Sequence, residues 1–209
     1  MSAQSSTKAA SAEKPTLTDH LRARTHFFID PIAGVMARLK LSPNLLTVTG
    51  MLAHIFFAWL IARGEMQWAA VAIFFIAPLD AFDGALARKL GMTKGGFGSF
   101  LDSTLDRIAE IFLFAGFLYY YSSQGDQLMM LVGYAALTGS LMVSYARARA
   151  EGLGISCKVG LFGRVERYTI LIVTLILNLP QWTLIILALG TFVTVGQRMW
   201  HVWRQTREG

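Results

Sequence analysis

Four aspartates stand at spacings that could bring their carboxylates together around a divalent metal ion. Asp80 and Asp83 are three residues apart, so they share one face of a helix. Asp102 and Asp106 are four residues apart and share one face of the next predicted helix. Since a short connector joins these helices, we expect the four acids to converge between them. Hard oxygen ligands without His or Cys favour Mg²⁺, with Mn²⁺ as a substitute.

The apolar surroundings of these acids strengthen the metal interpretation. Four like charges repel one another, and an ionised carboxylate within a membrane is costly unless a counter-charge lies nearby. Arg88, close after Asp83 in the sequence, could neutralise only one of the four acids. A bound cation is therefore the expected counter-charge.

Small residues accompany the acids on the first helix and on the connector. They could let a flat or phosphorylated group approach the backbone closely. Close helix packing without any ligand is the alternative, and for the glycines alone it is the simpler one. Interleaved with four acids and an arginine, the small residues favour a ligand. They are Gly84, Ala85, Ala87, Gly95, Gly96 and Gly98.

The composition is that of an integral membrane protein. Of the 209 residues, 54% are hydrophobic and only 15% are charged, which is too apolar for an ordinary soluble domain. A helix of about 20 apolar residues crosses a bilayer and satisfies its own backbone groups there. We therefore predict an all-α integral membrane protein with six transmembrane helices. Their expected ranges are 45–62, 68–90, 100–121, 128–150, 168–179 and 182–202, and the fifth is short unless it begins near Arg164.

Two further segments precede these helices. Residues 1–17 are rich in Ser, Ala, Lys and Thr and lack the apolar core of a signal peptide, so we expect a disordered tail. Residues 18–40 interleave apolar and basic side chains, which predicts an amphipathic helix on the membrane surface, broken near Pro31. Residues 18–209 then form one membrane domain, with the transmembrane helices within about 43–204.

The net charge of +6 is explained by membrane anchoring and anion binding rather than by nucleic acid, because the basic residues stand at the ends of apolar runs. The connectors at 64–67, 122–127 and 178–181 carry almost no positive charge. The positive-inside rule therefore predicts a multi-pass protein of the cell inner (plasma) membrane with both termini and the acids in the cytoplasm. Cys157 is the sole cysteine, which excludes a disulfide framework, and we assign it no role.

The acidic segment resembles the signature of the CDP-alcohol phosphotransferase family, with no position missing. That family moves a phosphatidyl or similar group from a CDP-linked lipid to an alcohol and releases CMP. The resemblance covers nearly the whole chain after about residue 20 and implies a Mg²⁺-dependent transferase of phospholipid biosynthesis. The signature runs Asp80-x-x-Asp83-Gly84-x-x-Ala87-Arg88, nine residues, then Gly98-x-x-x-Asp102-x-x-x-Asp106.

The resemblance implies unequal roles for the acids. Asp80, Asp83 and Asp102 would bind metal that contacts the CDP diphosphate. Asp106, also at the metal, would be the catalytic base that takes the proton from the acceptor hydroxyl. The implied nucleotide-binding residues are Asn44, Thr47, Asp80, Gly84, Ala87, Arg88 and Gly98. For Asn44 and Thr47, ordinary chemistry at a helix N-terminus is an equal alternative.

Four arginines in the second half of the chain could bind the phosphate of a phosphorylated acceptor, because guanidinium groups bind phosphate in a bidentate manner. They are Arg147, Arg164, Arg167 and Arg198. Ordinary positive-inside charge and a pairing of Arg167 with Glu166 or Glu151 are the alternatives.

These segments look most like the phosphatidylinositol-phosphate synthase branch of the family, which joins CDP-diacylglycerol to inositol 1-phosphate. Arg147 stands where that branch has Lys, and the segment GRVER lacks a Glu and a Pro of the branch. Glycerol 3-phosphate, the acceptor of phosphatidylglycerophosphate synthase, therefore stays open as a rival.

Two other classes of membrane protein are alternatives to this family. A prenyltransferase also holds a diphosphate with aspartates, but normally on separate segments of a longer chain. An ion-coupled transporter uses buried acids as well, although we find no internal repeat here and the acids lie toward one side of the membrane. Family members are commonly homodimers, which makes a homodimer the expected assembly.

Overall fold

The computed structural model describes residues 27, 30–76, 79–91 and 96–207, apart from the side chains of 79–81. Within these ranges the secondary structure is helical and includes no strand, which confirms the all-α prediction. A first helix is described over 30–38. The others are α2 (Pro43–Ala62), α3 (Met66–Ile76), α4 (Leu79–Lys89), α5 (Phe97–Ser123), α6 (Gln127–Glu151), α7 (Arg164–Ile176) and α8 (Pro180–Arg207).

Three of these helices, α2, α6 and α8, are long and apolar enough to cross a membrane. α5 is also long, with 27 residues or about 40 Å, but its first half carries the acids. Large apolar side chains face outward on α2 and α3, where Trp59 is 49% and Phe75 is 73% exposed. Outward aromatic groups of this size are expected of a surface that meets lipid rather than water.

The helix boundaries differ from the predicted ones chiefly in three places, one of which is α8, which continues to Arg207 beyond the expected 202. The helix expected over 68–90 is described as two elements, α3 and α4, on either side of 77–78, which lie outside the described residues. The helix expected over 168–179 begins earlier, at Arg164, and ends at Ile176. The expected tail at 1–17 and the first part of the expected surface helix, to residue 26, also lie outside the described residues.

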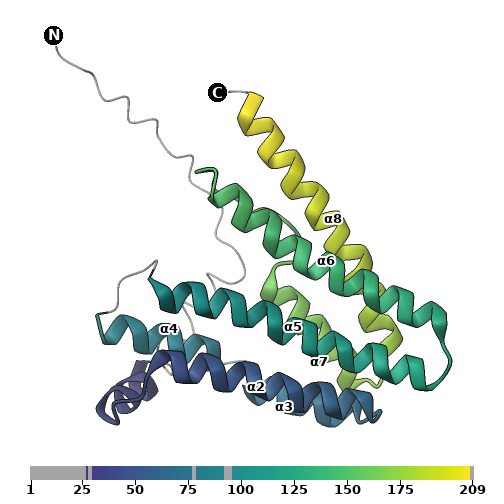
Figure 1. Ribbon diagram of the computed structural model, residues 1–209, viewed down its shortest axis with the longest axis horizontal. Helices are drawn as coiled ribbons and strands as arrows, with labels where there is room; N and C mark the ends of the chain where they lie inside the picture. The colour runs from purple at the N-terminus through teal and green to yellow at the C-terminus, as the bar shows by residue number, and fades with distance from the viewer. Residues whose placement is uncertain (1–26, 28–29, 77–78, 92–95, 208–209) are drawn as a thin grey trace.

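Figure 1 shows α2, α3, α4 and α5 lying along one another, with α6 and α8 side by side beyond α5. α7 lies between these groups and packs chiefly against α3 and α8. The core is formed by apolar side chains of α2, α3 and α5 to α8, including Phe57, Phe117 and Leu184. The helices that carry the predicted acids thus lie on one side of the molecule (Figure 1). All four predicted acceptor arginines are on α6, α7 or α8.

α2 and α5 cross closely at Gly116. A methyl group on Gly116 would lie 2.5 Å from the carbonyl oxygen of Ala58, so only glycine fits there. This crossing fixes how α5 lies along α2. It therefore also fixes the acids of α5 relative to the first turn of α2.

Candidate active site

The first turns of α2 meet α4 at one of the predicted metal ligands. Oγ1 of Thr47 donates a hydrogen bond to Oδ2 of Asp83 over 2.8 Å, and both residues are buried. α2 begins at Pro43, whose fixed φ suits the first helical position, after Ser42 in extended conformation. The hydroxyl of Thr47 also lies 3.1 Å from the carbonyl oxygen of Pro43, so its single hydrogen serves two acceptors.

The start of α5 lies against the same turn of α2. A methyl group on Gly98 would be 3.2 Å from Oδ1 of Asn44, a tight approach that favours glycine. On α4, a methyl group on Gly84 would lie 3.6 Å from Nη1 of Arg88, an ordinary contact distance. Ala87 on the same helix is half-buried. The structure therefore brings α2, α4 and α5 together at the residues predicted to bind the nucleotide.

Three of the four predicted metal-binding acids are described with their side chains. Asp83 is buried on α4, and Asp102 and Asp106 are half-buried on α5. Asp80 belongs to α4, but its side chain lies outside the described residues. Among the residues that are described, no three His, Cys, Asp or Glu side chains gather closely enough to hold a metal ion. The four-acid metal site thus stays a prediction.

The donor set nevertheless fits a hard divalent cation. The described candidates supply carboxylate oxygens, and the hydroxyl oxygen of Thr47 adds another oxygen at Asp83. Oxygen ligands of this kind suit Mg²⁺ or Mn²⁺. If a metal binds here, Asp83, Asp102 and Asp106 are the described residues that would hold it.

Asp106 already has cationic neighbours. Arg164, the first residue of α7, donates two hydrogen bonds to its carboxylate, at 2.5 Å from Nη1 and 2.8 Å from Nη2. Nη2 of Arg107 is 3.6 Å from the same carboxylate. The sequence pointed to Arg88 alone as a protein counter-charge and not to these two arginines, which also weaken the repulsion among the acids.

Tyr168 connects the first turns of α7 to α2. The guanidinium of Arg164 lies 5.7 Å from the centre of the Tyr168 ring. The hydroxyl of Tyr168 is 2.8 Å from Nε2 of His54, and Nδ1 of His54 is 2.8 Å from the carbonyl oxygen of Gly50. A carbonyl oxygen only accepts, so Nδ1 carries a hydrogen and a neutral ring accepts the tyrosine hydroxyl at Nε2.

Arg198, on α8, contacts the backbone of two other segments. Its Nε donates to the carbonyl oxygen of Val159 over 3.0 Å, and its Nη1 donates to the carbonyl oxygen of Val143. The side chain is buried, with 4% exposed. In this structure Arg198 thus joins α8 to α6 and to residues 152–163, which we call the α6–α7 connector.

Three other residues of α8 hold the same connector. Oε1 of Gln197 accepts from the backbone N–H of Leu161, and Oγ1 of Thr194 accepts from the N–H of Phe162. His201 Nε2 donates to the carbonyl oxygen of Ser156. Positions 194, 197, 198 and 201 share one face of a helix. This face of α8 sets the path of the connector up to the residue before α7.

The four predicted acceptor arginines have four different environments. Arg147 is half exposed and pairs with Glu151 at 2.8 Å, four residues further along α6. Arg164 pairs with Asp106, while Arg167 is buried against Glu110 at 2.5 Å. Arg198 contacts backbone carbonyls. The pairing of Arg167 with Glu166 or Glu151 considered from the sequence is not the one observed.

Glu110 was not singled out in the sequence, although a signal was present. It follows Asp106 by four residues and so extends the spacing of Asp102 and Asp106 by one more turn. An acidic residue inside an otherwise apolar helix is expected to have a functional or structural partner. Its partner, Arg167, is 57 residues away in sequence, and no local pattern reveals that pairing.

Comparison with known proteins identifies the family that the acidic signature resembles. Residues 40–196 match the family model described as CDP-alcohol phosphatidyltransferase. The chain is 36% identical to the archaetidylinositol phosphate synthase of Methanothermobacter thermautotrophicus, over 86% of this chain and 91% of that one. It is 33% identical to the phosphatidylinositol phosphate synthase of Streptomyces avermitilis, over 93% of this chain and 86% of that one.

A solved structure has the same fold. The phosphatidylinositol phosphate synthase of Mycobacterium tuberculosis with CDP-DAG bound superposes with a TM-score of 0.77 at 29% identity, covering 84% of this chain and 93% of that one. The same mycobacterial protein has been solved in complex with manganese and citrate, also with a TM-score of 0.77.

Proposed function

Because the chain belongs to the CDP-alcohol phosphatidyltransferase family, we propose that it transfers the phosphatidyl group of CDP-diacylglycerol to a hydroxyl of inositol 1-phosphate and releases CMP. The chain is accordingly a membrane-bound transferase of phospholipid biosynthesis. The names of its relatives support the acceptor, since the bacterial and archaeal proteins that it resembles are inositol phosphate enzymes of this type. The structure solved with CDP-DAG supports the donor.

One observation in this chain carries the proposal. Arg164 and Asp106 form a bidentate ion pair between the last acid of the signature and the first turn of α7. A guanidinium at that position could exchange the carboxylate for a phosphate, which offers the same bidentate geometry. The group proposed to receive the acceptor's proton and a group suited to the acceptor's phosphate are therefore in contact.

The residues of this chain would divide the work as follows. Asp80, Asp83, Asp102 and Asp106 hold Mg²⁺ or Mn²⁺, which when bound neutralises charge on the diphosphate. Asp106 accepts the proton of the attacking hydroxyl. The residues that line the nucleotide pocket are Asn44, Thr47, Asp80, Gly84, Ala87, Arg88 and Gly98.

The proposed acceptor site takes its charge from Arg147, Arg164, Arg167 and Arg198. The contacts of Arg164 support a direct role most strongly, because it is one-third exposed and already holds an anion. The contacts of Arg167 and Arg198 support an indirect role, since both side chains are buried and occupied within the protein.

The proposed membrane arrangement has six crossings, with α3 and α4 together making the second, preceded by an amphipathic surface helix at about 18–40 in a domain spanning 18–209. The outward aromatic side chains support it. We place both termini and the active site on the cytoplasmic side of the inner membrane, from the distribution of Lys and Arg. A homodimer is proposed as the assembly, and light scattering of the detergent-solubilised protein measures it.

The test is CMP release by the purified protein with CDP-diacylglycerol, Mg²⁺ and inositol 1-phosphate. Free inositol is the matched control, because it offers the same hydroxyls without the phosphate. We expect CMP and a phosphorylated phosphatidylinositol, detected by mass spectrometry, and loss of both after chelation of the metal. Faster CMP release with glycerol 3-phosphate than with inositol 1-phosphate would identify glycerol 3-phosphate as the acceptor instead. Replacing CDP-diacylglycerol with CDP-archaeol tests which lipid chains the donor carries.

A further inference from the structure

Glu110 is a buried acid for which the proposed reaction has no role. It lies on α5 with 3% of its surface exposed, among apolar residues such as Ala109 and Leu113. A buried carboxylate is unfavourable unless a hydrogen-bonded cation accompanies it. The presence of Glu110 therefore calls for a partner whose position matters.

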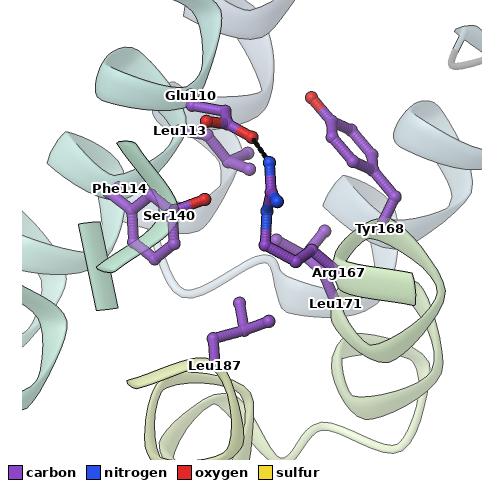
Figure 2. A pocket seen from close by; sticks show the side chains of 8 residues that line it. All are labelled: Glu110, Leu113, Phe114, Ser140, Arg167, Tyr168, Leu171 and Leu187. Atoms are coloured by element: carbon purple, nitrogen blue, oxygen red, sulfur yellow. Dashed lines mark hydrogen bonds and ion pairs between the residues drawn. The ribbon is translucent and has the colours of Figure 1, made fainter. Parts of the chain in front are cut away.

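That partner is Arg167 of α7. Nη2 of Arg167 donates to Oε1 of Glu110 over 2.5 Å, and each side chain is 4% exposed. Figure 2 shows the guanidinium extending from α7 into a small cavity, where its end meets the carboxylate of Glu110. Most of the other groups around the cavity are apolar, and they include Leu113, Phe114, Leu171 and Leu187. With little water to compete, the pair holds its geometry strictly.

The second carboxylate oxygen of Glu110, Oε2, is also buried. Among the described residues no donor makes a hydrogen bond to Oε2, although Nε of Arg107 lies 3.8 Å away. The carboxylate is thus held through Oε1. Replacing Glu110 with its amide would keep the shape and remove the charge that Arg167 requires.

Two ion pairs connect α5 to α7 one helical turn apart. Asp106 and Glu110 are four residues apart on α5, and their partners Arg164 and Arg167 are three residues apart on α7, so each helix presents one face. Nη1 of Arg167 also lies 3.3 Å from the carbonyl oxygen of Phe162, just before α7. Arg167 therefore fixes both the approach to α7 and its first turn.

From this geometry we infer that Glu110 is a positioning residue for the acceptor phosphate. By holding Arg167, it keeps the first turn of α7 where Arg164 reaches Asp106. Glu110 itself touches neither substrate. The part of the inference that concerns phosphate rests on the proposed function, whereas the hold on α7 does not.

Steady-state kinetics test the first part. Glu110→Gln is expected to raise KM for inositol 1-phosphate about 10-fold and to change KM for CDP-diacylglycerol less than about 2-fold, because the donor residues lie on α2, α4 and α5. Glu110→Asp keeps the charge and should recover most of the loss. The matched control is Glu65→Gln, an exposed acid between α2 and α3, which should leave both KM values unchanged. Equal rises in both KM values, or a lower Tm with unchanged KM values, would overturn the inference.

Hydrogen exchange tests the second part without any substrate. In Glu110→Gln the amides of 165–168 should exchange faster, while those in the middle of α2 should not change. Unchanged exchange at 165–168 would overturn the hold on α7. If Glu110→Gln does not fold, Arg167→Lys, which keeps the charge but loses the guanidinium geometry, carries the same two measurements. A wild-type protein that releases no CMP with any polyol phosphate defeats the proposed function, and the exchange result still decides whether Glu110 holds α7.

Discussion

The acids and the arginines of the proposed active site are built in different ways. The acids come from one short segment, Asp80 to Asp106, on two helices that both pack along α2. The arginines come from α6, α7 and α8. Three of them pair with carboxylates on different parts of the chain, and Arg198 donates to backbone carbonyl oxygens. A contiguous pattern of ligands can be recognised in a sequence because helix geometry alone brings its members together. The role of an arginine depends on contacts made by distant parts of the chain.

The arginines can be ranked by their burial and by the partners that they contact. Arg198 and Arg167 are buried and bound within the protein, Arg164 is partly exposed and bound to a predicted catalytic acid, and Arg147 is half exposed. Removing a buried arginine that has partners within the protein should lower stability. Removing a partly exposed arginine beside the site should weaken binding of the acceptor. One substitution of an acid and three of arginines test the comparison.

The largest effect is expected for Asp106→Asn. The amide has nearly the same shape but cannot accept the proton, so kcat should fall by about 10³-fold, or about 4 kcal/mol. CMP release and binding of CDP-diacylglycerol in the presence of Mn²⁺ are measured together. Retained lipid binding identifies Asp106 chiefly as the base, and lost binding would make it chiefly a metal ligand.

Arg198→Ala should have the next largest effect, on stability. It removes the donors to the carbonyl oxygens of Val143 and Val159, which should lower the free energy of unfolding by about 3 kcal/mol. Thermal unfolding in detergent measures it, with Arg149→Ala on the exposed surface of α6 as control. An unchanged Tm with a raised KM for the acceptor alone would show that Arg198 binds phosphate directly.

Arg164→Ala should act on the acceptor. Loss of one bidentate phosphate contact is expected to raise KM for inositol 1-phosphate about 30-fold, or about 2 kcal/mol. Because the substitution also removes a cation from Asp106, the affinity for Mn²⁺, followed by electron paramagnetic resonance, should not fall. A loss of Mn²⁺ binding would contradict the expectation that Mn²⁺ and the Arg164 guanidinium compete for Asp106.

The smallest effect is expected for Arg147→Ala. Its pair with Glu151 is exposed to solvent, and such pairs contribute little. KM for the acceptor should change less than about 3-fold, and Tm should match that of Arg149→Ala. A rise as large as that of Arg164→Ala would place Arg147 at the phosphate and remove the distinction drawn between them.

Hydropathy predicted the helical class and the approximate position of the long helices, because apolar runs dictate which segments can lie in lipid. It failed at the start of α7, where the turn from Arg164 to Arg167 is polar and carries no hydropathy signal. It also ended α8 at 202, although the helix continues to Arg207 through a polar end. Helix ends that leave the apolar layer follow hydrogen bonding rather than hydropathy.

The acids were predictable as a group, and their neighbours were not. The contact of Thr47 with Asp83 joins positions 36 residues apart, and that of Arg164 with Asp106 joins positions 58 apart. Such pairs depend on how α2, α5 and α7 cross, which one sequence does not reveal. The burial of Glu110 is explained by its ion pair with Arg167, which is 57 residues away in sequence.

The face of α8 that holds the α6–α7 connector has a consequence for biosynthesis. Thr194, Gln197, Arg198 and His201 are synthesised about 30 residues after Arg164, yet they fix the segment that leads to it. Chains fold progressively as they are made. The carboxylate side can thus assemble before α8 is made, but the arginine side is completed only when α8 is in place. A nascent chain would therefore acquire the proposed donor pocket before the proposed acceptor site.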